Sequence, residues 1–68
     1  MQLVINGQRQ EVQPGLTIDL LVASLHRAPD GRGVAVAVDG EVVPRGAWEK
    51  TPLDDGARVE IVAAVQGG

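Results

Sequence analysis

The sequence predicts an α+β fold: five short strands in one sheet, with one main helix packed on one face. Strands are predicted because β-branched residues concentrate in short stretches bounded by Gly, Asn, Asp and Pro, and valine alone accounts for 11 of the 68 residues. The helix is predicted because one stretch repeats apolar residues at helical spacing. A single helix covers one face of such a sheet, so we expect the other face to remain open.

The first two strands are predicted to form a hairpin. Residues 1–5 place apolar side chains at every odd position, a two-residue period that is typical of a strand. Asn6-Gly7 follows and favours a type I′ turn, in which both central residues take positive φ. Residues 8–12 return as a polar strand, which we expect at the sheet edge, and Pro14-Gly15 ends it.

The helix is predicted to begin after Thr17, a residue that suits the N-cap position. Asp19 places a negative charge in the first turn, where the helix dipole favours it. The face expected to be buried consists of Ile18, Leu21, Val22 and Leu25. The helix should end near His26 or Arg27, because Pro29 disfavours helical backbone in the residue before it.

A second hairpin is predicted after the helix. Residues 34–38 alternate valine and alanine, which places valines on one face and alanines on the other. Asp39-Gly40 is again a type I′ signal, residues 41–43 return as a strand, and Pro44 closes it. A connection then holds a helical turn around Trp48, which we expect to pack at the edge of the core; a partner contact is the alternative.

The last strand is predicted over residues 58–65, after an Asp55-Gly56 turn. Alternation directs Val59, Ile61 and Ala63 to one face and Arg58, Glu60 and Val62 to the other. The resulting order, ββαββ followed by a connection and a strand, is that of the β-grasp, or ubiquitin-like, fold.

Composition excludes several classes of function. The chain has no cysteine and one histidine, so it holds no thiolate metal site. A net charge of −3 with one aromatic residue disfavours nucleic-acid binding. No apolar stretch approaches the roughly 20 residues that span a bilayer, and no signal peptide is visible, so we expect a cytoplasmic protein without a membrane partner. His26 and the pair Asp54-Asp55 are interpreted as structural, at a helix end and in a solvated turn.

The chain ends on Gly67-Gly68, directly after the last strand. Glycine lacks a Cβ, so such an end can enter a narrow channel and present an unhindered carboxylate. The alternative is an inert, frayed terminus. We therefore expect a globular domain over residues 1–64 and a flexible tail over residues 65–68.

The sequence closely resembles the ThiS family, the sulfur carrier proteins of thiamine biosynthesis, over essentially its whole length. The segments that carry the resemblance are Met1–Gly7, Val34–Val38, Gly40–Arg45, Trp48, Asp55-Gly56, Arg58–Val62 and Val65–Gly68. Asp39 and Ala57 depart from the family pattern, both away from the terminus. The resemblance implies a mixed sheet, with the first and last strands parallel and adjacent at its centre.

The resemblance also implies the chemistry. Gly68 would be adenylated by an activating, ThiF-like enzyme that uses ATP and Mg²⁺, and a persulfide donor would convert it to a thiocarboxylate. That group would donate sulfur to thiazole synthase, a ThiG-like partner. Gly67 would supply slim backbone beside the reacting centre, while Val65 and Gln66 would guide the tail. The chain would be a protein substrate with no cofactor of its own, not an enzyme, and a monomer when free.

A partner surface is expected on the open face of the sheet. Its predicted members are Val62, Ala35, Ala37 and one of Val42 or Val43, of which we select Val43. Ordinary exposure of scattered apolar residues is the alternative. Three other functions remain open from the residues: a sulfur carrier for molybdopterin synthesis, a ubiquitin-like protein modifier, and a plain binding module.

Overall fold

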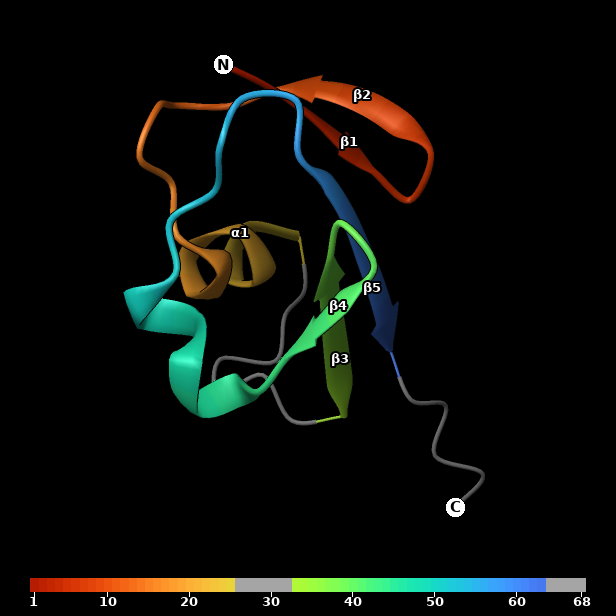
Figure 1. The fold of residues 1–68 in the computed structure, drawn as a ribbon, viewed down its shortest axis with the longest axis vertical. Helices are drawn as coiled ribbons and strands as arrows, with labels where there is room; N and C mark the ends of the chain where they lie inside the picture. The colour runs from red at the N-terminus through yellow and green to blue at the C-terminus, as the bar shows by residue number, and fades with distance from the viewer. Residues whose placement is uncertain (26–32, 64–68) are drawn as a thin grey trace.

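The computed structural model describes residues 1–25 and 33–63, and these contain every element that the sequence predicts. In chain order the elements are β1 (Gln2–Ile5), β2 (Gln8–Glu11), α1 (Ile18–Leu25), β3 (Val34–Val38), β4 (Glu41–Val43), the 3₁₀ helix η1 (Arg45–Lys50) and β5 (Arg58–Ala63). Figure 1 shows α1 packed across one side of the sheet, with η1 beside it. No helix among these residues has the length and apolar character needed to cross a membrane.

The five strands form one sheet in the order β2-β1-β5-β3-β4, so β5 lies at its centre (Figure 1). β5 is parallel to β1 and antiparallel to β3. The mixed β-grasp sheet is therefore confirmed, and with it the central pairing of the first and last strands. β2 lies at the edge and all of its residues are exposed, as its polar sequence predicts.

Both predicted hairpin turns have the backbone geometry that their dipeptides favour. Asn6 and Gly7 take φ of 50° and 82°, and Asp39 and Gly40 take 50° and 86°. Positive φ at two successive residues defines a type I′ turn, which matches the twist of the strands it connects. Local sequence alone therefore places these two turns.

The core lies between the sheet and α1 and is almost entirely aliphatic. Its buried members are Leu3, Ile5, Ile18, Leu21, Val22, Val36, Trp48, Leu53, Ala57, Val59 and Ile61. Three of the four predicted helix-face residues are among them. The fourth prediction, Leu25, is wrong: it is the last residue of α1, beyond the buried turns, and its side chain remains 42% exposed.

The start of α1 lies where Thr17 predicts it. The Thr17 carbonyl accepts the Leu21 N–H at 3.0 Å, which is the first bond of the helix. The Thr17 hydroxyl donates to the Asp19 carboxylate, so it ties the cap to the first turn through a side chain. The cap position is confirmed, although its hydroxyl does not bond to backbone N–H.

Trp48 is a core residue. Only 4% of it is exposed, and its indole Nε1 donates to the Val43 carbonyl at 2.9 Å. The bond satisfies the one polar atom of the side chain and ties η1 to the end of β4. The packing interpretation is confirmed, and Trp48 is unavailable as a surface contact.

Candidate functional site

β5 is the element that leads to the predicted reactive end, and the sheet holds it from both sides. Toward β3 its pairing runs from Val38↔Val59 to Val34↔Ala63. Toward β1 it is held by two backbone bonds, in which Val4 donates to the Ala57 carbonyl and Asn6 to the Val59 carbonyl, both at 2.9 Å. Central strands are the most stable part of such a sheet, so β5 provides a rigid base up to Ala63.

The predicted tail residues lie outside the part of the chain that the structure describes. These residues are Val65, Gln66, Gly67 and Gly68. The description of β5 ends at Ala63, two residues before Val65. The structure therefore describes the base from which the tail extends.

The open face next to β5 carries an apolar patch on three neighbouring strands. Cross-strand pairing places Ala35 opposite Val62 and Ala37 opposite Val42. Val62 is 63% exposed and Val42 is 75% exposed, although both are large apolar side chains. We call Ala35, Ala37, Val42 and Val62 the open-face patch.

The structure moves one predicted patch residue to the other side of the sheet. Val43 pairs with Val36, which is 1% exposed, and it packs against the core. Paired residues share a face and successive residues alternate, so Val42 and not Val43 faces outward. In a three-residue strand with two adjacent valines, the alternating pattern allows either valine to face outward. Only the register with β3 decides which one does.

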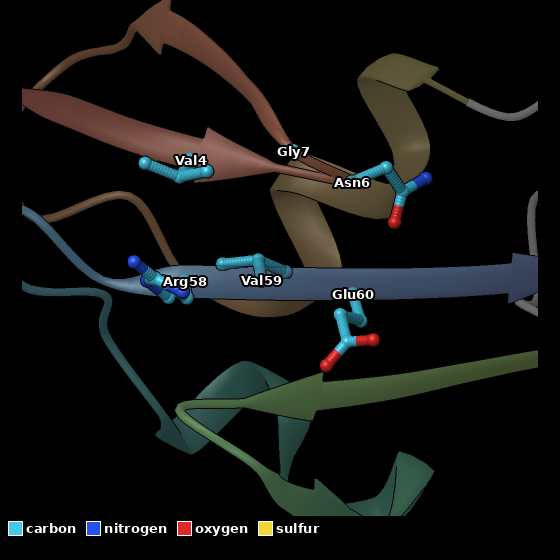
Figure 2. Close-up of a pocket in the computed structure, with 6 residues that line it drawn as sticks. All are labelled: Val4, Asn6, Gly7, Arg58, Val59 and Glu60. Atoms are coloured by element: carbon cyan, nitrogen blue, oxygen red, sulfur yellow. The ribbon is translucent and has the colours of Figure 1, made fainter.

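A hollow of about 500 Å³ lies on the seam between β1 and β5 (Figure 2). Its lining residues are Val4, Asn6, Gly7, Arg58, Val59 and Glu60. Val4 pairs directly with Arg58, and Glu60 pairs with Ala37 of the open-face patch. The hollow therefore lies next to the open-face patch and adds the charged side chains of Arg58 and Glu60 to this side of the sheet.

The Asn6 side chain is a feature of this region that the sequence did not reveal. Its Oδ1 accepts the Ile61 N–H at 2.8 Å, and its Nδ2 donates to the Ile61 carbonyl at 3.2 Å. The only local signal was the Asn6-Gly7 turn, which does not identify a partner 55 residues away.

Other polar side chains of the described residues have structural roles. Asp55 Oδ1 accepts the Gln2 N–H at 2.7 Å, which joins its turn to the start of β1. The Ser24 hydroxyl donates to the Leu21 carbonyl within α1. Residues 1–25 and 33–63 contain no cluster of three metal-ligating side chains. His26 lies outside the described residues. The described bonds of Asp55 and Ser24 are therefore ones that stabilise the fold.

Comparison with known proteins identifies the family. The ThiS family model matches residues 3–68. The sulfur carrier protein ThiS of Escherichia coli is 28% identical over 68 residues, which cover all of both chains. A thiazole synthase of Paramagnetospirillum magneticum is 37% identical over the whole of this chain, which spans 20% of that protein.

Solved structures agree with this match. The crystal structure of the thiamine biosynthesis protein ThiS from Geobacter metallireducens has a TM-score of 0.81 and 31% identity, with complete coverage of both chains. A solution structure of a thiamine biosynthesis protein from the same organism also gives 0.81, at 33% identity, and covers all of this chain and 88% of that one. Fold and sequence therefore agree over the full length. The chain belongs to the ThiS family, the small β-grasp sulfur carriers of thiamine biosynthesis, and is a carrier protein and not an enzyme.

Proposed function

We propose that Gly68 carries the sulfur, first as an acyl-adenylate and then as a thiocarboxylate. The observation that supports this most directly is the position of β5, a central, doubly paired strand that leads straight into the last five residues. The family match also extends through residue 68. The proposal makes the globular domain a rigid base and residues 65–68 a tail that reaches into other proteins.

The chemistry requires activation of the terminal carboxylate. A carboxylate is ionised at neutral pH and lacks a good leaving group, so it resists nucleophilic attack. Attack of its oxygen on the α-phosphorus of ATP releases pyrophosphate and leaves an acyl-adenylate. Sulfur from a persulfide then attacks the carbonyl carbon and AMP leaves, and reduction of the sulfur–sulfur bond by a thiol frees the thiocarboxylate.

The catalytic groups for these steps belong to partners. We assign the adenylation, with its ATP and Mg²⁺, to a ThiF-like activating enzyme, since Mg²⁺ neutralises phosphate charge in such reactions. We assign the sulfur to a persulfide donor and its delivery to a ThiG-like thiazole synthase. The Paramagnetospirillum protein supports the last assignment, because a segment similar to this whole chain occurs within a polypeptide named thiazole synthase.

The tail suits a recessed active site. Four extended residues reach about 13–14 Å, enough to pass a narrow entrance while the domain stays outside. Gly67 and Gly68 add no side chains beside the reacting carbon, and Val65 and Gln66 are left to guide the tail. We place the free carrier in the cytoplasm, where ATP is supplied, and as a monomer whose open face is accessible.

We assign the open-face patch to docking on the activating enzyme. Replacing Val42 and Val62 together by Asp should weaken binding by about ten-fold or more, because docking would bury two unpaired charges. Both side chains are more than half exposed, so the free domain should fold normally. Titration calorimetry with the activating enzyme measures the effect.

Leu20→Asp is the matched control for that double variant. Leu20 is 56% exposed but lies on α1, which covers the opposite face of the sheet. This variant should bind within about two-fold of the wild type, as expected for a residue outside an interface. Equal binding by all three proteins would contradict the docking assignment.

The proposed function is tested by the intact mass of the protein isolated from its host. Replacement of one oxygen by sulfur, confined to the C-terminal peptide, is the expected result. A lysine of a target protein joined to Gly68 through an isopeptide bond would instead identify a ubiquitin-like modifier. An unmodified end in cells that are synthesising thiamine would contradict the carrier role.

A further inference from the structure

The two sides of β5 are held unequally toward its C-terminal end. On the β3 side the pairing continues to Ala63. On the β1 side strand pairing stops at Ile5↔Val59, because the chain turns away at Asn6-Gly7. The Ile61 backbone would therefore lack a strand partner on this side.

The Asn6 side chain fills that place. Its Oδ1 accepts from the Ile61 N–H at 2.8 Å, and its Nδ2 donates to the Ile61 carbonyl at 3.2 Å. A primary amide has an acceptor and a donor side by side, so it supplies the two kinds of group that a continued β1 backbone would offer. The side chain thus extends the parallel ladder by one residue beyond the end of β1.

Ile61 is anchored both by its side chain and by its backbone. Its side chain is 6% exposed and its backbone is held by Asn6, whereas the next residue, Val62, is 63% exposed. Gly68 is the seventh residue after Ile61, and seven extended residues span about 23–25 Å. Without Asn6, the last contact with β1 moves back to Val59, and the end of β5 up to Ala63 is then held by β3 alone.

We propose that Asn6 is a positioning residue for adenylation: its side-chain amide sets the point at which β5 is released from β1, and thereby where the Gly68 carboxylate lies in the activating enzyme. This inference rests on the proposed function of Gly68. A fixed release point restricts the conformations available to the tail, so more of the docked complexes hold the carboxylate at the reacting position.

The chain contains a matched control at the opposite end of β5. Asp39 occupies the same position of the second hairpin turn, with the same φ of 50°, and its Oδ1 accepts the Arg58 N–H at 3.0 Å. Glycine takes positive φ readily, so Asn6→Gly and Asp39→Gly both preserve the turn while removing the side-chain bond, and both add the same backbone freedom. One variant loosens the tail end of β5 and the other its start.

The experiment compares the two variants in the free protein and in adenylation. In Asn6→Gly, amide hydrogen exchange at Ile61 should accelerate by about five-fold, and the turnover number for ATP–pyrophosphate exchange should fall by a similar factor. The dissociation constant for the activating enzyme should change by less than about two-fold, because the open-face patch is untouched. Asp39→Gly should accelerate exchange at Arg58 and leave turnover near that of the wild type.

Three results would overturn the proposal. Equal turnover in both variants would show that the Asn6 bonds have a structural role alone. A loss of binding that accounts for all the lost turnover would show that Asn6 is a docking contact. Unchanged hydrogen exchange at Ile61 would show that the Asn6 side chain does not protect the Ile61 amide. The turnover of the wild-type chain in the same assay distinguishes a failure of this proposal from a failure of the proposed function. If the wild-type chain is not adenylated, the proposed function of Gly68 is contradicted as well.

Discussion

Removal of Gly68 is expected to abolish adenylation, with ATP–pyrophosphate exchange reduced to the background of the activating enzyme alone. The truncated chain still ends in a carboxylate, that of Gly67, but this group lies one residue short. One extended residue spans about 3.3–3.6 Å, so the Gly67 carboxylate would stop that far short of the α-phosphorus. Attack needs the reacting atoms within about 3–3.5 Å of each other, and a shortfall of this size prevents it. The measurement is exchange of labelled pyrophosphate into ATP at saturating carrier.

A second variant separates the effect of tail length on adenylation from the effect of side-chain bulk at the last residue. Gly68→Ala keeps the carboxylate at the right distance and adds one methyl group beside it. We expect a partial loss, about ten-fold in kcat/KM, since a channel that accepts glycine has little room for a Cβ. Both variants should retain the wild-type dissociation constant within a few-fold. Exchange at wild-type rates by the truncated chain would show that Gly68 is not the acceptor.

Replacing Trp48 by Ala is expected to remove a large part of the free energy of unfolding at 25 °C. Trp48 is 4% exposed in a core without Phe or Tyr, so no neighbouring aromatic ring can fill the space. Truncation of a buried Trp costs about 3–5 kcal/mol, and a domain of this size has a free energy of unfolding of only about 3–10 kcal/mol. Far-UV circular dichroism in urea measures the loss, because the variant has no tryptophan fluorescence.

Trp48→Phe divides this effect into its two parts. Phe retains much of the ring packing but leaves the Val43 carbonyl without the bond that indole Nε1 donates at 2.9 Å. We expect a loss of about 1–3 kcal/mol and a folded protein. Leu20→Ala, at an exposed position of α1, should change stability by about 0.5 kcal/mol or less. Comparable loss in Leu20→Ala and Trp48→Ala would disprove the assignment of Trp48 to the core.

Much of the fold follows from signals that span only a few residues. The Asn6-Gly7 and Asp39-Gly40 dipeptides predict both hairpin turns, and the backbone angles confirm them. The alternation in residues 34–38 predicts which side of β3 is buried, and Val36 is 1% exposed. These predictions succeed because φ preference and side-chain alternation act within one strand or turn.

The predictions that failed depend on neighbours far along the chain. Val43 and Val42 are adjacent in sequence, and only pairing with Val36 and Ala37 assigns them to opposite faces. Leu25 continues the helical period of Leu21 and Val22, yet the buried part of α1 ends before it. In both cases the local pattern is satisfied by two arrangements and tertiary contact selects one.

By itself, the sequence determined the order of elements, the two hairpin turns and, through its resemblance over the whole chain, the family. Only the tertiary structure decided that Val42 completes the open-face patch and that Asn6 holds Ile61. The reason is the range of the interactions: turn angles and alternation are properties of neighbouring residues, whereas the bonds from Asn6 join residues 55 positions apart. Such bonds exist only after β1 and β5 have come together at the centre of the sheet.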